Sequence, residues 1–151
     1  MVFEYCLNKA SESELVQHLS HCDADFVPTL SSRMEINDYA KKLANYAVRF
    51  EAWSDDALVG LVAAYCNDAT RRTAYISSVS VVSARHGYGV ASELLRQCVA
   101  HAKYLEMEQI DLEVGRSNSK AINLYAKSGF VPKMGDAPFV VMEMKLTGLN
   151  A

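Results

Sequence analysis

Hydrophobic and polar positions predict two helices in the first third of the chain. After a short strand at residues 2–7, Ser11-Glu12-Ser13-Glu14 forms a capping box, the pattern that starts a helix. The apolar positions that follow fall on one helical face, namely Leu15, Leu19 and Cys22. Residues 23–33, rich in Ser and Asp, indicate a loop. A second amphipathic helix is expected from Ile36 to about Ala47, and its predicted buried positions are Tyr39, Ala40, Leu43 and Ala47.

The apolar pattern then changes to the period of a strand. Residues 47–53 alternate between apolar and polar side chains, and short polar turns lead into two further apolar segments, 58–65 and 73–82. Three consecutive strands joined by short turns predict an antiparallel meander.

A long helix is expected next, from about Tyr88 to Leu105, with one apolar stripe made of Ala91, Leu94, Leu95, Cys98, Val99, Ala102 and Leu105. A strand at 109–114, a helix at about 119–128 and two closing strands complete the order β-α-α-β-β-β-α-β-α-β-β. This order mixes hairpins with crossovers and predicts an α/β (α+β) fold: a six- to seven-stranded mixed sheet flanked by about four helices. No repeat or linker interrupts it, so residues 1–151 are expected to form a single domain.

Composition and charge exclude several classes of function. The net charge of −3 and the pI near 5.8 provide no basic surface for nucleic acid. The longest apolar run, 57–66, is too short to cross a bilayer, and Glu4 stands where a signal peptide carries positive charge. The four cysteines show no CxxC spacing and are expected to be reduced, so we predict a cytoplasmic protein.

The most informative segment is the strand, loop and helix of residues 79–95, whose loop contains Gly87 and Gly89. Glycines allow close backbone approach, and the free amides of a helix N-terminus attract anions, so the loop suits a pyrophosphate. Many glycine turns only connect a strand to a helix, however. The loop also matches neither a Walker A sequence nor a GxGxxG fingerprint.

The run His86-Gly87-Tyr88-Gly89-Val90-Ala91 resembles the acetyl-CoA signature of the GNAT superfamily, a strand followed by Gln/Arg-x-x-Gly-x-Gly/Ala at the start of a helix. His86 stands where that family usually has Gln or Arg. A second segment, 112–130, resembles the family's later strand, its Asn-x-x-Ala helix, its tyrosine and its Gly-Phe ending. The resemblance covers residues 76–131.

The resemblance implies a GNAT-like fold, acetyl-CoA as co-substrate without a metal, and direct attack of a primary amine on the thioester within a ternary complex. It assigns acetyl-CoA binding to Val79, Val81, His86, Gly87, Tyr88, Gly89, Val90, Ala91 and Asn118. A backbone amide near Val79 would stabilise the oxyanion, and Asn118 would hold the pantetheine arm. Asn118 also suits a helix N-cap, and that role could be its only one.

Two side chains are the catalytic candidates. The resemblance puts Tyr125 beside the sulfur as the acid that protonates the departing thiolate, whereas periodicity alone favours a core aromatic. Leu112-Glu113-Val114, with Asn118 and Tyr125, resembles the ribosomal-protein-alanine acetyltransferases, in which a glutamate here deprotonates the amine. Glu113 is therefore the candidate base. An exposed, non-catalytic glutamate is the alternative reading, and Glu51, Asp68 or water are the alternative bases.

The acceptor amine stays open between a small molecule, an amino sugar and a peptide N-terminus. The loop at residues 23–28 and the helix at 36–47 are expected to shape its pocket. A non-catalytic acetyl-CoA sensor or assembly module is the alternative function, and a homodimer is left open. His18, His21 and Cys22 lack a second ligand pair at zinc-site spacing, so we expect exposed histidines and no metal. For Trp53 and Tyr65, core packing is favoured over a place in an acceptor cleft.

Overall fold

The computed structural model describes residues 2–133 and 138–146, which form one seven-stranded sheet in the order β1-β2-β3-β4-β5-β7-β6. The strands are β1 (Glu4–Leu7), β2 (Val48–Ser54), β3 (Ala57–Tyr65), β4 (Thr73–Val81), β5 (Gln109–Gly115), β6 (Val131–Pro132) and β7 (Phe139–Lys145). The α-helices are α1 (Glu12–Cys22), α2 (Ile36–Tyr46), α3 (Val90–Tyr104) and α4 (Ser119–Lys127). The predicted mixed sheet and its element order are confirmed.

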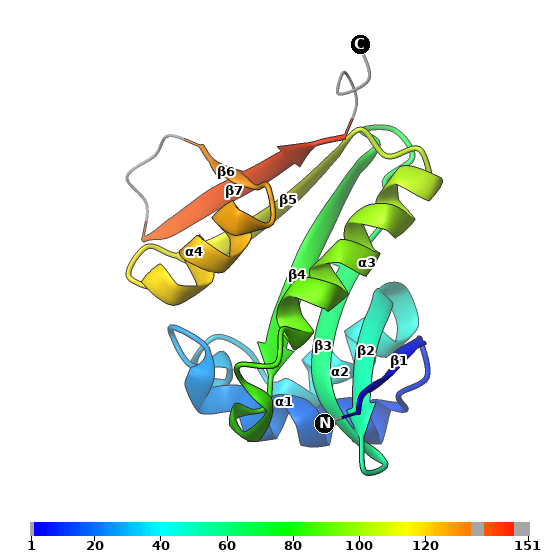
Figure 1. Ribbon diagram of the computed structural model, residues 1–151, viewed down its shortest axis with the longest axis vertical. Helices are drawn as coiled ribbons and strands as arrows, with labels where there is room; N and C mark the ends of the chain where they lie inside the picture. Colours follow the sequence, from blue (N-terminus) through cyan, green and yellow to red (C-terminus); the bar gives the residue numbers. More distant parts are fainter. Residues whose placement is uncertain (1, 134–137, 147–151) are drawn as a thin grey trace.

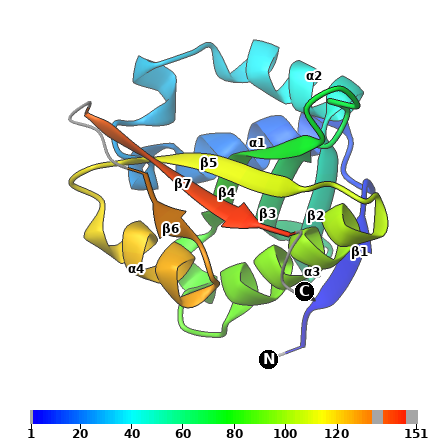
Figure 2. The ribbon, with the colours of Figure 1, turned by 90° about the horizontal axis from the view of Figure 1, so that it is seen from above.

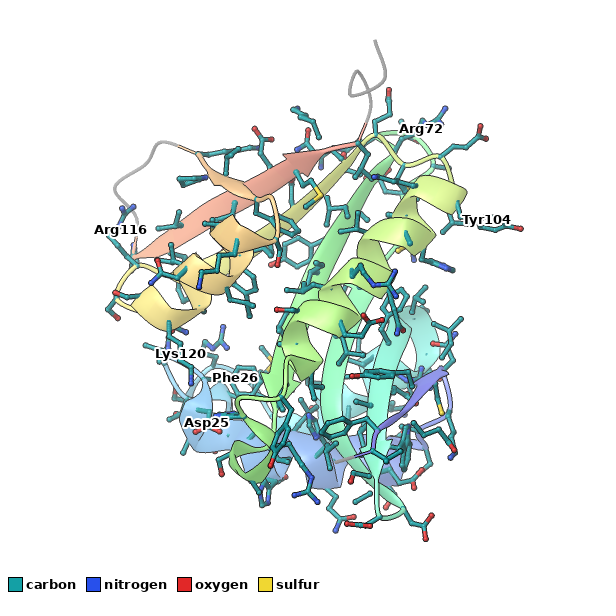
Figure 3. All side chains as sticks on the ribbon, in the orientation of Figure 1. Asp25, Phe26, Arg72, Tyr104, Arg116 and Lys120 are labelled. Carbon is teal, nitrogen blue, oxygen red and sulfur yellow. The ribbon has the colours of Figure 1, made fainter. Side chains whose placement is uncertain are left out.

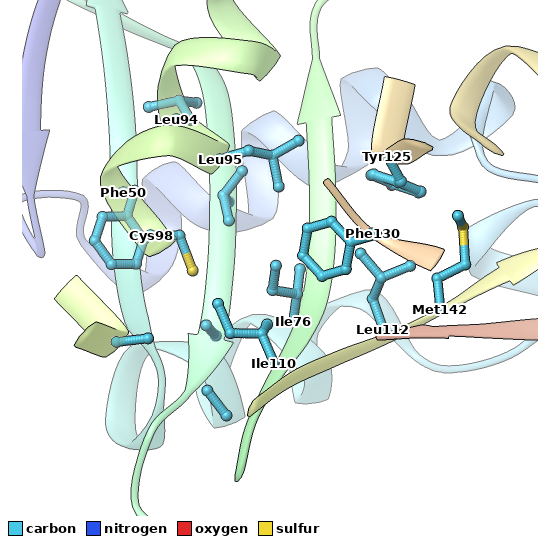
Figure 4. Packing of buried hydrophobic residues seen from close by; sticks show 14 of the residues in the cluster. Phe50, Ile76, Leu94, Leu95, Cys98, Ile110, Leu112, Tyr125, Phe130 and Met142 are labelled. Carbon is cyan, nitrogen blue, oxygen red and sulfur yellow. The ribbon is translucent and has the colours of Figure 1, made fainter. Parts of the chain in front are cut away.

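The helices cover the two faces of the sheet in pairs (Figure 2). One core cluster joins α1 and α2 to β2 and β3 through residues such as Leu19, Leu43 and Leu61. The other joins α3 and α4 to the opposite face, and Figure 4 shows Leu95 of α3 and Tyr125 of α4 within it. The side chain at each sheet position therefore faces one of two separate helix layers.

Strand β2 does not show the exposure expected from its alternating sequence. Its polar residues Arg49 and Glu51 are 6% and 0% exposed, because α1 and α2 cover their face of the sheet. Arg49 donates to the carbonyls of Leu43, Ala44 and Ala10. Its Nε has no hydrogen-bond partner among the described residues but lies 3.4 Å from Glu51 Oε2, so the buried charge is paired. An alternating strand sequence therefore marks two faces here, but not which of them meets water.

Strands β4 and β5 form the parallel pair of the sheet, and they pair over only part of their length. Their register runs from Thr73–Gln109 to Ile76–Leu112 and ends there. At the same point, the β3–β4 ladder shifts register between Ala63 and Ala64. Ser77 of β4 is the extra residue, and this bulge bends β4. Beyond it the two strands spread apart toward their carboxyl ends (Figure 1). The sheet therefore opens between β4 and β5.

Helix α3 begins close to the sheet because Gly60 of β3 has no side chain. A Cβ at Gly60 would lie 2.7 Å from Val90 Cγ1, at the first residue of the helix. Leu94, Leu95, Cys98 and Ala102 of the predicted stripe are buried, whereas Leu105 is 41% exposed because the helix ends at Tyr104. The contact at Gly60 fixes where the glycine loop meets the sheet.

The predicted capping box is present at α1: Glu14 N donates to Ser11 Oγ, and Ser11 N donates to the Glu14 carboxylate. Within residues 2–133 and 138–146, none of the helices has the length and apolar character needed to span a bilayer.

Candidate active site

A cavity of about 790 Å³ lies where β4 and β5 part. This volume is in the range of sites for small molecules and cofactors. One group of lining residues comes from the glycine loop, α3 and α4, and includes Gly87, Gly89, Ala91, Asn118 and Tyr125. A second group comes from the other face of the sheet and from the segment between α1 and α2, and includes Asp25, Phe26, Arg33, Tyr75 and Glu113. The cavity is therefore lined from both sides of the sheet.

The glycine loop has a backbone that side chains would disfavour. Gly87 and Gly89 have φ values of +86° and +75°, and Gly89 is the N-cap of α3. A Cβ at either glycine would meet no atom within 4 Å, so the loop is open on its outer side. The first amides of α3 have no partner within the helix and provide donors for an anion.

Tyr88 differs from its neighbours in the loop. Its side chain is 53% exposed and packs edge-on against Phe3, with ring centroids 5.8 Å apart, and it does not line the cavity. Any part that Tyr88 takes in coenzyme binding would therefore fall to its backbone.

The β3–β4 register leaves backbone groups of Val79 and Val81 directed at the opening. Val82 N donates to Val59 O, so Val82 and, two residues back, Ser80 are the residues that pair with β3. The N–H and C=O groups of Val79 and Val81 then point the other way, toward β5. Beyond Ile76, β5 no longer pairs with them.

His86 uses one of these carbonyls. Its Nε2 lies 2.7 Å from Val81 O, and its side chain is otherwise exposed, as expected for a loop histidine. The neighbouring Arg85 lines the cavity and pairs with Asp55, with Nη2 and Oδ2 3.4 Å apart. His86 therefore occupies a backbone carbonyl at the edge of β4, beside the cavity.

Helix α4 positions Asn118 and Tyr125. Asn118 Oδ1 accepts a hydrogen bond from Ala121 N at 3.2 Å, so its capping role is confirmed, and the residue also lines the cavity. Tyr125 is 8% exposed and packs edge-on against Phe130 at 6.3 Å between ring centroids (Figure 4). Burial raises the pKa of Tyr125 to about 12, so the phenol keeps its proton at neutral pH. Its hydroxyl has no hydrogen-bond partner among the described residues.

Glu113 lies on the other side of β5. Strand alternation places it with Asp111, opposite the buried Ile110, Leu112 and Val114, and it is exposed in the cavity wall. Tyr75 of β4 is its neighbour: burial, and then the negative charge of Glu113, raise the pKa of Tyr75. A carboxylate and a phenol therefore stand together on this face of the sheet.

The two alternative acids lie away from the cavity. Glu51 is fully buried and accepts hydrogen bonds from Lys9 N, Ala10 N and Trp53 Nε1. Asp68 accepts from Arg71 N in the turn between β3 and β4. Neither lines the opening between β4 and β5, so Glu113 is better placed than either to act as the base.

The expectations for His18, His21, Trp53 and Tyr65 can be compared with the structure. His18 was expected to be exposed, and this is wrong: it is 3% exposed, whereas His21 is exposed. Trp53 is a core residue, 5% exposed, as favoured from the sequence. Tyr65 lines a smaller hollow at the other end of the strands. Over residues 2–133 and 138–146, no cluster of three or more His, Cys, Asp or Glu side chains could hold a metal ion.

Several cavity residues were missed by sequence reasoning. Ser77, Ser78 and Ser80 of β4 face α1 and α2, and Tyr39 Oη contacts Ser77 O and Ser77 Oγ at 3.1 and 2.5 Å. The feature of the sequence that could have revealed them is the presence of three serines among the apolar residues of a strand. Lys120 on α4 also lines the cavity and was missed as well. Asp25 and Phe26 line it too (Figure 3), as expected for the loop at residues 23–28.

Comparisons with known proteins agree on the fold. The crystal structure of the PaiA N-acetyltransferase from Thermoplasma acidophilum, in complex with coenzyme A, matches at a TM-score of 0.76 and 19% identity, over 96% of this chain and 99% of that one. A ribosomal-protein-alanine N-acetyltransferase from Brucella melitensis matches at a TM-score of 0.73 and 17% identity, over 97% and 100%. An acetyltransferase from Bacillus subtilis in complex with CoA matches at 0.72 and 18% identity, over 96% and 99%.

The search of curated proteins gave no significant match. The model of the acetyltransferase (GNAT) family matches residues 13–130, from α1 through the glycine loop to the end of α4. The match takes in the opened strands, the glycine loop and Tyr125, which are the parts that build the cavity. This chain therefore belongs to the acetyltransferase (GNAT) family and is an acyltransferase.

Proposed function

We propose that the protein transfers the acetyl group of acetyl-CoA to a primary amine by direct attack within a ternary complex. The observation that carries the proposal is the opening of the sheet beyond Ile76. It leaves the backbone groups of Val79 and Val81 without a β5 partner beside a glycine loop at a helix N-terminus. An extended pantetheine arm fits such a strand edge, and a pyrophosphate fits the amides at the start of α3.

The residues of the loop fit this coenzyme. Gly87 and Gly89 leave open space above the loop, and Arg85 supplies a cation in the cavity wall. His86, bound to Val81 O, must share or release that carbonyl when a pantetheine amide pairs with β4. We therefore expect His86 to weaken coenzyme binding without abolishing it. Asn118 remains the candidate contact of the pantetheine arm, in addition to its role as a cap.

The reaction has three physical requirements. The amine must lose a proton, because a lysine-like amine with a pKa of ~10.4 is almost fully charged at pH 7. The oxyanion formed on the thioester carbonyl needs a donor, for which the outward-facing Val79 N–H is available. The coenzyme A thiolate must then be protonated as the carbon–sulfur bond breaks. Tyr125 has a pKa of about 12 and therefore keeps its proton at neutral pH, so it is suited to this last role.

Glu113 is the proposed acceptor of the amine proton, directly or through water. Its exposure in the cavity wall leaves it accessible to a substrate, and no Lys or Arg of the described residues forms an ion pair with it. On this assignment the amine enters from the α1–α2 face and the coenzyme from the α3–α4 face, and the two meet in the opening between β4 and β5.

The acceptor can be identified with a panel that separates the three candidate classes. Purified protein with acetyl-CoA is incubated with an alanine-initiated peptide, glucosamine or spermidine, and products are read by mass spectrometry. A mass increase of about 42 Da, the net gain when an acetyl group replaces one hydrogen of the amine, is expected for at least one class. If the protein binds coenzyme A and modifies none of these amines or a wider amine library, the proposal fails in favour of the acetyl-CoA sensor.

A further inference from the structure

A buried histidine and two buried serines stand beside the cavity and have no part in the chemistry described above. His18 of α1 is 3% exposed, and Ser78 and Ser80 of β4 are 4% and 8% exposed. Both serines line the cavity, on the face where α1 and α2 cover the sheet. Their side chains come from elements more than fifty residues apart, and a polar group at this depth needs a partner.

The hydrogen bonds of His18 fix its tautomer. Its Nδ1 lies 3.1 Å from Leu58 O, and a carbonyl can only accept, so Nδ1 carries a proton. Burial lowers the pKa of His18 to about 4, so the ring is neutral at pH 7 and Nε2 has no proton. Ser80 Oγ, 2.8 Å from Nε2, must then be the donor. Its proton is directed at His18, and the thiol of Cys22 also interacts with its oxygen, which leaves one lone pair for a ligand.

Ser78 adds a second observation. Its Oγ is buried and has no partner with hydrogen-bond geometry among the described residues, although it lies near enough to the Tyr39 hydroxyl to offset part of the rise that burial causes in the pKa of that phenol. A buried hydroxyl without a well-placed partner is unfavourable, and a ligand in the cavity that Ser78 lines can supply one when this side chain turns toward it. Cys22 also lines this wall, with Sγ 3.8 Å from His18 Nε2. Burial raises the pKa of the Cys22 thiol to about 12, so it is not a thiolate nucleophile.

We propose that Ser80 and Ser78 form the subsite for the acceptor amine, in which Ser80, oriented by its bond to His18, accepts a hydrogen bond from the amine nitrogen. His18 is a positioning residue: it acts only through Ser80. The inference rests on the proposed transfer to an amine and identifies which groups hold that amine. A neutral primary amine offers two N–H donors, for which the hydroxyl oxygens of Ser80 and Ser78 are acceptors.

The first test is steady-state kinetics with the same three amines at saturating acetyl-CoA. Ser80→Ala should raise the apparent KM for the amine about threefold to tenfold, the value of roughly one hydrogen bond. The apparent KM for acetyl-CoA should not change. Ser78→Ala should also raise the amine KM, with little change in melting temperature, because its hydroxyl has no well-placed partner to lose. Ser20→Ala, on the exposed side of α1, is the control.

Two substitutions of His18 separate positioning from packing. In Gln, the amide oxygen is three bonds from Cβ, the same number as His Nε2. It can therefore still accept a hydrogen bond from Ser80. The Asn amide is two bonds from Cβ, as Nδ1 is, so it can contact Leu58 O but cannot reach Ser80. We expect His18→Asn to raise the amine KM as Ser80→Ala does, and His18→Gln to leave it near the wild-type value. His21→Asn is the exposed control.

The tautomer can be observed directly. Nitrogen-15 chemical shifts of the His18 ring should report a neutral, Nδ1-protonated imidazole at pH 7. An Nε2-protonated ring, or an amine KM that is unchanged in both Ser80→Ala and Ser78→Ala while wild type turns over, would overturn the subsite alone. A wild-type protein that acetylates no amine would instead overturn the proposed function, and the subsite with it.

Discussion

Glu113 and Tyr125 line the same cavity from opposite faces of the sheet. Tyr125 packs in the core between α3, α4 and the sheet with Leu112, whereas the side chain of Glu113 projects from the other side of β5. The two can act on one reaction only in the opening where β4 has parted from β5. This arrangement makes separate predictions for the two residues.

Replacing Tyr125 by Phe should reduce turnover without loss of stability. Loss of a general acid costs about 10²–10⁴ in rate. The hydroxyl makes no hydrogen bond within the described residues, and the ring contact with Phe130 is retained, so the melting temperature should stay the same. Kinetics and thermal melts on Tyr125→Phe test this. A destabilised variant with normal kcat would make Tyr125 a core aromatic only.

The high pKa of Tyr125 also predicts a pH dependence. Because burial raises this pKa to about 12, the phenol is protonated and neutral throughout the range in which the protein is studied. Loss of the acid form should therefore appear only above about pH 11, and no limb of the kcat profile between pH 6 and 9 should disappear in Tyr125→Phe. A limb in that range that depends on Tyr125 would contradict the assignment.

Glu113→Gln should lower kcat/KM and alter its acidic limb while coenzyme affinity is unchanged. The carboxylate must be ionised to accept a proton, so activity through Glu113 falls as the pH drops and the group is protonated. Asp111→Asn is the matched control, because Asp111 is on the same face of β5 but does not line the main cavity. If wild type and Glu113→Gln had the same pH profile, water and not Glu113 would accept the proton of the amine.

Gly89 should be the position at which coenzyme binding is most easily blocked. Its φ of +75° makes any side chain cost about 1–2 kcal/mol, and Glu adds a negative charge where a pyrophosphate is expected. Saturating acetyl-CoA at a hundredfold excess over Kd should stabilise wild type by ~2.7 kcal/mol. Gly89→Glu should lose this shift, and Gly89→Ala, which has the strain without the charge, should retain part of it. If both variants were stabilised by acetyl-CoA as much as the wild type, the coenzyme would bind elsewhere.

Gly60 should be needed for the start of α3 to pack closely against β3. Gly60→Ala places a methyl group 2.7 Å from the stiff Val90 side chain and should cost about 1–3 kcal/mol, read as a lower melting temperature. Val90→Ala in the same chain should recover much of that loss, because it removes the contacting methyl groups. Additive losses in the double variant would mean that the two residues do not meet.

Features that depend on neighbours in the sequence could be predicted. The capping box at Ser11 and the buried face of Leu15, Leu19 and Cys22 are local, and all are present. The turn glycines and the helix that follows them were found for the same reason. His18 could have been assigned to the same buried face, since it lies three residues after Leu15 and four before Cys22. Its polarity, and not its spacing, led to the wrong expectation.

Features that depend on distant segments could not be predicted. Glu51 is buried because the backbone at Lys9 and Ala10 happens to supply its donors, and Ser80 is buried because His18 reaches it from α1. The α1–α2 segment reaches the cavity by a close contact, in which Val27 O would lie 2.7 Å from a Cβ at Gly115. Such pairings join segments far apart in the sequence, and no period or motif indicates them.

The central claim is that this cavity carries out acetyl transfer and does not only bind the coenzyme. Its most direct test is the time-resolved release of free thiol from acetyl-CoA, measured together with the mass of the amine product. We predict one thiol released for each N-acetylated amine, no release without an amine, and loss of both in Tyr125→Phe. Coenzyme A binding without thiol release in the presence of any amine would contradict the claim and identify a non-catalytic acetyl-CoA-binding protein.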